Sequence, residues 1–162
     1  MPAVPMLRLA ERGDAGAIAT LSRDRIEHGL GWRWTAPRVL RSIADPASNV
    51  IVAGTAGPER QLTGFGIMKY RDDEAHLLLL AVAAHAGRRG IGTALVAWLE
   101  GSARVAGIGQ VYLEARLTNA AARAFYARLG YHEIQTLPGY YRGVEACVRL
   151  AKDLWVAPVA PG

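Results

Sequence analysis

The segment that most constrains the fold is a nearly all-apolar stretch from Glu74 to Ala83, which leads through a glycine-rich loop into an amphipathic helix. A strand of this composition is typical of the centre of a sheet, where both faces are covered. The loop spans Gly87 to Thr93, and the apolar residues that follow at helical spacing predict a helix ending near Gly107. That apolar stripe is Ile91, Leu95, Trp98 and Leu99.

Shorter segments on both sides also alternate between strand and helix patterns, which predicts a mixed α/β (α+β) domain. Asp14 is the expected N-cap of the first helix, and Pro37 lies in the first turn of the second. Residues 1–155 are expected to form a single domain, followed by a frayed tail over 156–162. The expected strands are Met6–Leu9, Asn49–Ala53, Leu62–Tyr70, Gln110–Glu114, Tyr131–Leu137 and Val144–Leu150, and the further helices are Thr35 or Ala36 to Ile43 and Asn119–Leu129.

Composition excludes several classes of protein. Cys147 is the only cysteine among 162 residues, so no disulfide can form within the chain and a thiolate metal site is disfavoured. The longest apolar run, Leu77 to Ala84, is far shorter than a bilayer span, which predicts a cytoplasmic protein without a membrane segment. The net charge is +5, but the sequence has no long Lys/Arg run. Nucleic acid is therefore not expected as a partner, whereas a phosphorylated cofactor is compatible with this charge.

The loop Gly87-Arg88-Arg89-Gly90-Ile91-Gly92-Thr93 has the chemistry of an anion site. The start of a helix presents unpaired N–H groups and the positive end of the helix dipole, and glycines let a phosphate approach them. The loop lacks the lysine of a P-loop, and its glycine order differs from the dinucleotide fingerprint. By itself, the pattern also fits a strand-to-helix turn that binds nothing.

Three segments together carry a family resemblance: EAHLLLLAVAAHAGRRGIGTALV, VYLEARLTNAAARAFYARLGYHEI and GYYRGVEACVRL. They resemble the GNAT superfamily of N-acetyltransferases, especially the branch that includes bacterial ribosomal-protein-alanine and other protein N-terminal acetyltransferases. The resemblance implies a central mixed sheet of about seven strands flanked by about four helices, with strands 4 and 5 splayed around the pantetheine arm of acetyl-CoA. One departure is Gly87, where the family usually has Gln or Arg, and its effect on cofactor binding stays open.

The resemblance also implies a set of cofactor contacts. The strand backbone before the loop would bind the pantetheine arm, and the loop amides would bind the pyrophosphate. Asn119 would contact the pantetheine, and Tyr126 would reach the thioester sulfur. The full set of expected cofactor-binding residues is Leu80, Ala81, Val82, Gly87, Arg88, Arg89, Gly90, Ile91, Gly92, Thr93, Asn119 and Tyr126.

Glu114 and Tyr126 are the expected catalytic residues. A carboxylate at Glu114 could take the proton of the attacking amine, and Tyr126 could donate a proton to the departing thiolate. Each has a structural alternative: Glu114 could pair with Arg116, Tyr126 could be a core tyrosine, and Asn119 could be only a helix cap.

Aromatic residues from two segments are expected to hold the acceptor beside Glu114. These are Trp32, Trp34, Tyr140 and Tyr141, although both tryptophans could instead merely cover the sheet. The four histidines show no metal spacing and are interpreted as surface or incidental residues, and no metal is expected. The chain is therefore predicted to move an acetyl group from acetyl-CoA to a primary amine, above all a protein or peptide N-terminus, as a monomer or homodimer. A small-molecule amine or amino acid as acceptor, and a coenzyme A sensor without turnover, remain alternatives.

Overall fold

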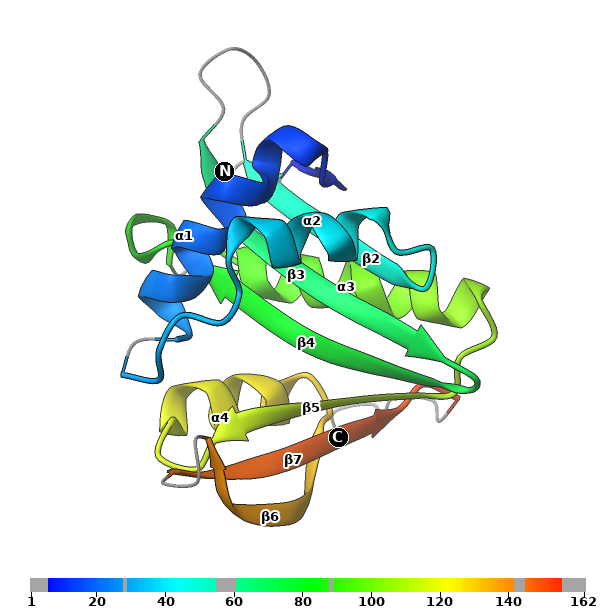
Figure 1. Ribbon diagram of the computed structural model, residues 1–162. Helices are drawn as coiled ribbons and strands as arrows, with labels where there is room; N and C mark the ends of the chain where they lie inside the picture. Colours follow the sequence, from blue (N-terminus) through cyan, green and yellow to red (C-terminus); the bar gives the residue numbers. More distant parts are fainter. Residues whose placement is uncertain (1–5, 28, 55–60, 88, 142–144, 156–162) are drawn as a thin grey trace. The chain divides into compact units, whose positions relative to one another are not determined.

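The computed structural model describes residues 6–27, 29–54, 61–87, 89–141 and 145–155. Seven strands form one mixed sheet in the order β1-β2-β3-β4-β5-β7-β6, with four α-helices, so the predicted fold class is confirmed (Figure 1). The elements, in chain order, are β1 (Leu7–Leu9), the 3₁₀ turn η1 (Arg12–Asp14), α1 (Ala15–Arg25), α2 (Ala36–Ala44), β2 (Ser48–Gly54), β3 (Leu62–Arg71), β4 (Glu74–Val82), the 3₁₀ turn η2 (Ala84–Ala86), α3 (Ile91–Val105), β5 (Gln110–Arg116), α4 (Ala120–Arg128), β6 (His132–Tyr141) and β7 (Glu145–Asp153).

The chain divides into two compact units, which are described one at a time. The first comprises residues 1–69 and 77–101, and the second comprises residues 70–76 and 102–162. A single domain over 1–155 stays a prediction, and the tail 156–162 lies outside the described residues. Within the second unit, β4 pairs with β5 in parallel from Glu74↔Gln110 to His76↔Tyr112. The predicted splay concerns the later part of β4, which belongs to the first unit, and it also stays a prediction.

In the first unit, helices cover both faces of the strands (Figure 1). Phe65 and Ile67 of β3 and Leu79 of β4 belong to a buried cluster with Ile18 of α1 and Val39 of α2. On the other face, Gly64 and Gly66 of β3 lie against α3, because a Cβ there would meet its side chains. On β4, Leu79 belongs to the cluster, and Leu80 Cδ1 would lie 3.4 Å from a Cβ on Gly66, on the α3 side, so the predicted cover on both faces is confirmed for the part of β4 in this unit.

The glycines of β3 let α3 approach the sheet closely. A Cβ on Gly64 would lie 3.0 Å from the Ala81 carbonyl oxygen, 3.1 Å from Ile91 Cγ2 and 3.2 Å from Leu95 Cδ1. A Cβ on Gly66 would lie 2.9 Å from Leu99 Cδ1. These three helix residues recur at i, i+4 and i+8, so they belong to the apolar stripe that the sequence predicted. The absence of a side chain at the two glycines therefore sets how closely the start of α3 approaches β3.

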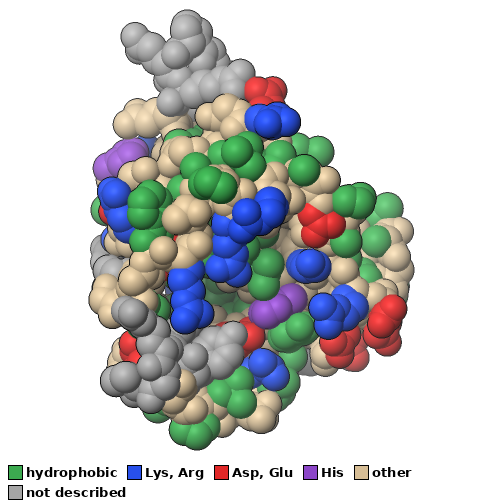
Figure 2. Space-filling view, viewed as in Figure 1, with side chains coloured by type: hydrophobic (Ala, Val, Ile, Leu, Met, Phe, Trp, Pro, Cys, Tyr) green, Lys and Arg blue, Asp and Glu red, His purple; other side chains and the backbone are tan. Residues whose placement is uncertain are grey.

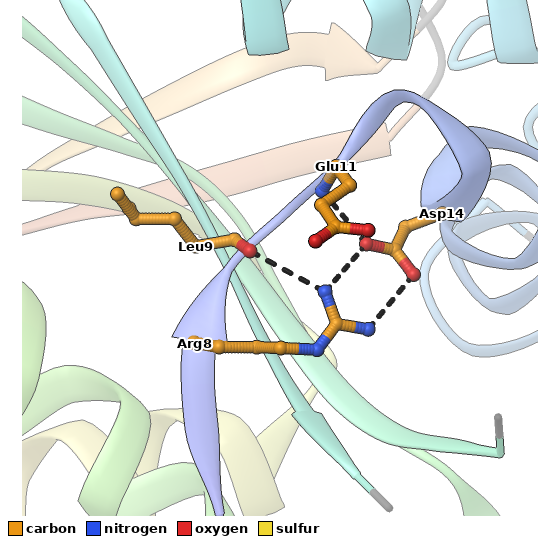
Figure 3. Close-up of polar contacts among 4 residues, drawn as sticks. All are labelled: Arg8, Leu9, Glu11 and Asp14. Carbon is orange, nitrogen blue, oxygen red and sulfur yellow. Dashed lines mark hydrogen bonds and ion pairs between the residues drawn. The ribbon is translucent and has the colours of Figure 1, made fainter. Parts of the chain in front are cut away.

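Asp14 is the N-cap residue of α1, as predicted, but its side chain makes no capping hydrogen bond to that helix. Its carboxylate, only 3% exposed, binds Arg8 of β1 through two bonds, Nη1–Oδ2 at 2.8 Å and Nη2–Oδ1 at 3.0 Å (Figure 3). The Glu11 N–H also donates to Asp14 Oδ2 at 2.7 Å. A paired charge satisfies a buried carboxylate better than backbone amides alone, and the ion pair joins β1 to the start of α1.

The second unit packs α4 beside the antiparallel strands β5, β7 and β6. Asn119 caps α4, because its Oδ1 accepts the Ala122 N–H at 3.1 Å. Arg123 of α4 forms a two-point ion pair with Glu133 of β6, with bonds of 2.8 and 2.9 Å. Cys147 is fully buried in β7, and burial, followed by the nearby Glu114 charge, raises the pKa of its thiol.

Candidate active site

A cluster of polar side chains lies on one face of the sheet in the second unit. His76 Nε2 of β4 is 2.8 Å from Glu114 Oε2 of β5. Arg149 Nη2 of β7 lies 3.4 Å from the other carboxylate oxygen, Oε1. The His76 ring stacks on Tyr112 with centroids 4.3 Å apart and planes at 17°, and Arg149 Cζ lies 5.6 Å from the Tyr112 ring centroid.

Strand register brings these residues together. Tyr112 and Glu114 are two residues apart on β5, so their side chains lie on the same face. Tyr112 pairs with His76 across the parallel ladder, and Glu114 pairs with Arg149 across the antiparallel one. The intervening Leu113 points to the opposite side and is buried. Four residues from three strands are thereby placed together.

The carboxylate of Glu114 is nearly buried, with its side chain 6% exposed, whereas His76 and Arg149 keep 25% and 30% exposure. When Glu114 is ionised, its carboxylate accepts a hydrogen bond from the His76 Nε2–H. Burial, followed by the charge of Glu114, raises the pKa of the Tyr112 phenol. A buried carboxylate beside an imidazole can accept and hold a proton, as a general base requires.

The sequence interpretation missed His76, which it treated as incidental, and it offered Arg116 as the alternative partner of Glu114. Arg116 Nη1 lies 3.9 Å from Glu145 Oε2, at the limit of an ion pair. Arg149 also has a buried Nε with no hydrogen-bond partner among the described residues. The available signal for His76 was its place in β4, two residues after Glu74, but pairing with β5 cannot be read from spacing alone.

Tyr126 of α4 is 8% exposed, and its ring makes edge contacts with Phe125 and Tyr131 at centroid distances of 5.0 and 5.6 Å. Burial raises the pKa of its phenol above the ordinary value, so the hydroxyl is protonated at neutral pH. Asn119, seven residues earlier, uses its side-chain oxygen as the helix cap. A contact from Asn119 to pantetheine would therefore come from the amide nitrogen, and both cofactor roles stay predictions.

In the first unit, the end of β4 has backbone groups that point away from β3. The Ala83 N–H donates to the Thr63 carbonyl at 2.8 Å, and bonding to one neighbour alternates along a strand. The amides of Leu80 and Val82 therefore face the other side, while Ala81 shares the orientation of Ala83. The Val82 carbonyl accepts Arg25 Nε at 3.2 Å.

The loop before α3 has the backbone that an anion site needs. Gly90 has φ of 75°, which favours glycine, and its carbonyl accepts the Ala94 N–H at 3.0 Å. The N–H groups of Ile91, Gly92 and Thr93 lie in the first turn, which contains no acidic residue. Arg89 is exposed, and Arg88 lies outside the described residues. Gly87 has φ of −61°, so its backbone would accept the Gln or Arg usual in the family.

The two tryptophans expected in an acceptor site differ in exposure. Trp34 is 8% exposed and belongs to the buried cluster of the first unit, with Arg38 Cζ 4.0 Å from its ring centroid. Trp32 is 45% exposed. Trp34 therefore covers the core, and Trp32 is the one with surface to offer an acceptor. Tyr140 and Tyr141 end β6, and their side chains lie outside the described part of the structure.

Buried Glu27 holds the segment that carries these tryptophans. Its Oε1 accepts the N–H groups of Arg33 at 2.7 Å and Trp34 at 3.0 Å, and its Oε2 accepts the Ser22 hydroxyl at 2.9 Å. The connection from α1 to α2 therefore has a fixed backbone beside exposed Trp32. Sequence reasoning did not identify this role of Glu27.

Two other features are absent from the described ranges. No group of three or more His, Cys, Asp or Glu side chains there could hold a metal ion. None of the helices in those ranges has the length and apolar character needed to cross a membrane.

The parallel β4–β5 pair, the glycine turn before α3 and the carboxylate on β5 define the class of mixed α/β proteins to which acetyltransferases belong. Residues 19–131 match the model of the acetyltransferase (GNAT) family, so the chain belongs to that family.

Curated relatives of the chain are named as N-acetyltransferases. The [ribosomal protein bS18]-alanine N-acetyltransferase of Escherichia coli is 36% identical over 81 residues, which cover 50% of this chain and 55% of that protein. The N-alpha-acetyltransferase of Sulfurisphaera tokodaii is 35% identical over 82 residues, which cover 50% of this chain and 49% of that protein. The chain thus spans about half the length of the curated relatives it matches.

Solved structures share the fold over nearly the whole chain. The crystal structure of the E. coli ribosomal-protein-S18-alanine N-acetyltransferase has a TM-score of 0.79 at 25% identity and covers 98% of this chain and 99% of that one. The structure of yncA from Salmonella typhimurium with its cofactor acetyl-CoA has a TM-score of 0.78 at 19% identity, covering 98% of this chain and 100% of that one. The second likeness shows the fold alone.

Proposed function

We propose that this protein transfers the acetyl group of acetyl-CoA to a primary amine, and that the acceptor is the N-terminal amine of a protein or peptide. The observation that carries the proposal is the nearly buried Glu114 carboxylate with His76 Nε2 at 2.8 Å. A coenzyme A sensor without turnover has no use for such a pair. The names of the relatives and the family membership support the same reaction.

The pair serves to remove a proton from the acceptor. An α-amine has a pKa of roughly 8, so most of it is protonated at neutral pH and cannot attack a thioester. Glu114 accepts the proton, directly or through one water, and His76 shares the charge through its hydrogen bond. A lysine amine, with a pKa of roughly 10.4, would cost about 3 kcal/mol more to deprotonate, which favours an N-terminal amine.

Tyr126 is proposed to act on the sulfur of the departing coenzyme A. Its buried phenol stays protonated and can donate a hydrogen bond to the departing thiolate. Complete proton transfer would be uphill, because an alkyl thiol has a pKa of roughly 8.5 and burial raises the phenol further above that value. Tyr126 therefore stabilises charge on the sulfur, and the thiolate can leave as an anion.

The residues of the first unit fit the acyl donor. The N–H groups of Ile91, Gly92 and Thr93 suit a diphosphate, since the first turn of α3 carries no carboxylate that would repel it. Leu80 and Val82 offer strand amides for the pantetheine arm, with the Val82 N–H toward the carbonyl oxygen. Bound acetyl-CoA supplies the activated thioester, and these residues bind and orient it.

We place the reaction in the cytoplasm, with the protein as a monomer or homodimer that needs neither nucleic acid nor membrane. The similarity to a ribosomal-protein N-acetyltransferase supports this setting. Only Arg142-Gly143-Val144 separate Tyr141 from β7, and a connection this short would leave the acceptor site more open. A small-molecule amine is therefore the second acceptor to test.

The test is release of free thiol from acetyl-CoA in the presence of N-terminal peptides and small amines. Background from the protein is low, because its single cysteine is buried. We expect Glu114→Gln to lower the rate at pH 7 by about 100-fold or more, with partial recovery at higher pH as the amine loses its own proton. Glu133→Gln is the matched control, since Glu133 binds Arg123 on the exposed side of the same unit. Equal rates for both variants would remove Glu114 from the mechanism, and no turnover with any amine would refute the function.

A further inference from the structure

The surface of the first unit carries a concentration of arginine that the proposed reaction does not explain. Between residues 23 and 41 the sequence has five arginines and two carboxylates. Figure 2 shows basic side chains gathered over the helices of this unit, with few acidic ones among them. We use the name arginine face for the five arginines of this segment, Arg23, Arg25, Arg33, Arg38 and Arg41.

The two carboxylates of this segment do not neutralise the arginine face. Glu27 is 7% exposed, and its oxygens are engaged by backbone N–H groups and the Ser22 hydroxyl. Asp24 is paired with Arg23 at 3.0 Å. Arg25 and Arg33 are exposed, and no carboxylate among the described residues pairs with either. Their positive charge is therefore directed to solvent.

One member of the arginine face, Arg25, contacts the end of β4, which is proposed to bind the thioester. Arg25 donates to the Val82 carbonyl at 3.2 Å, which puts a guanidinium beside the residue whose N–H would polarise the thioester. Glu27 fixes the backbone of Arg33, next to exposed Trp32. A peptide rises about 3.3 Å per residue, so a side chain one or two residues after the reacting amine could contact these cations.

We propose that the acceptor is a peptide amino terminus with acidic residues at its second and third positions, recognised by Arg25 and Arg33 beside Trp32. The inference rests on the proposed function and narrows its substrate. A guanidinium presents several N–H donors in a plane that matches a carboxylate. Phosphate backbones have the same charge, but this surface offers only one exposed aromatic ring and no Lys/Arg run, so an acidic peptide fits better.

The test compares three peptides that share an N-terminal alanine and differ in the next two residues: Glu-Glu, Gln-Gln or Arg-Arg. We expect kcat/KM to be about threefold to tenfold higher for the acidic peptide than for the neutral one at low salt, the range expected for two exposed charge pairs. Raising salt from about 0.01 M to about 1 M shortens the Debye length from about 30 Å to about 3 Å. The kcat/KM values of the acidic and neutral peptides should then differ by less than about twofold.

Arg33→Glu should lower the acidic-to-neutral ratio at least about threefold while the rate with the neutral peptide changes little. Arg128→Glu is the control, because Arg128 is an exposed arginine at the end of α4 and gives the same change in net charge. A fluorescence titration with the acetylated acidic peptide, in the parent and in Trp32→Phe, reports binding apart from turnover. If Arg33→Glu and Arg128→Glu change the acidic-to-neutral ratio of kcat/KM equally, the assignment of the arginine face to an acidic acceptor is overturned.

The remaining outcomes separate this inference from the proposed function. Turnover with equal kcat/KM for all three peptides, or with small amines alone, would overturn the acidic acceptor and leave the acetyltransferase standing. Thiol release that no peptide and no small amine increases would refute both. Tight binding of an RNA oligonucleotide that Arg33→Glu abolishes and the acidic peptide does not displace would assign the arginine face to nucleic acid instead.

Discussion

The replacement of Gly64 by alanine tests how packing places the start of α3. The added Cβ would lie 3.0 Å from the Ala81 carbonyl oxygen, 3.1 Å from Ile91 Cγ2 and 3.2 Å from Leu95 Cδ1. Contacts this short on three sides force the neighbours to move, at a typical cost of about 1–3 kcal/mol. Alanine also lowers the conformational entropy of the unfolded chain, which stabilises the folded state by about 0.4–1 kcal/mol. The net loss of unfolding free energy should be about 0.5–2 kcal/mol.

That loss should lower Tm by about 1–8 °C, since 1 kcal/mol corresponds to about 2–4 °C in a chain of this size. The neighbours that must move, Ile91 and Ala81, belong to the elements proposed to bind acetyl-CoA. Gly64→Ala should therefore also raise the Kd for coenzyme A by severalfold. Thermal unfolding and isothermal titration calorimetry measure the two effects.

Gly101→Ala is the matched control. Gly101 lies within α3, and a Cβ there would meet no atom within 4 Å. Alanine in a helix is more stable than glycine by about 0.5–1 kcal/mol, so this variant should unfold at a higher temperature and bind coenzyme A normally. If Gly64→Ala matches the parent protein in both Tm and Kd, the close packing of β3 against α3 does not set the position of the loop.

Two further predictions concern the second unit. His76→Gln keeps an N–H donor for Glu114 but removes the imidazole ring that stacks on Tyr112 and shares the carboxylate charge, so kcat should fall about tenfold while the KM for acetyl-CoA is unchanged. A parent-like kcat would leave His76 only a structural role. Because burial raises the pKa of Tyr126, the unfolded state releases that proton first above pH of about 10. The parent should therefore lose stability relative to Tyr126→Phe by about 1.4 kcal/mol per pH unit there, as urea unfolding at about pH 8 and pH 11 would measure; a constant difference would contradict the burial of the phenol.

Local patterns in the sequence predicted most elements and the form of the loop. Helical spacing after Gly90 located α3, and the polar residue Asn119 located the start of α4. The start of α2 was also correct, because Pro37 lies in its first turn after Thr35. Each of these signals acts within a few residues, so tertiary contacts do not change it.

The interactions of charged side chains were harder to predict, because they depend on partners far along the chain. Asp14 lies at the N-cap position of α1, but its carboxylate pairs with Arg8 of β1 and not with the helix amides. Glu114 had Arg116 two residues away, yet adjacent same-face positions on one strand lie farther apart than directly opposite positions on paired strands. Arg149, 35 residues later, is the one directly opposite.

The same reasoning explains why the proposed catalytic pair was only half predicted. Glu114 stands in a motif that a family resemblance can carry, whereas His76 gains its role only when β4 and β5 pair in parallel with His76 opposite Tyr112. A shift of that register by one residue would turn His76 to the opposite face and remove the imidazole from the carboxylate. The short ladder from Glu74 to His76 is therefore as necessary to the proposed chemistry as the carboxylate itself, although none of the site residues expected from the family resemblance lies in it.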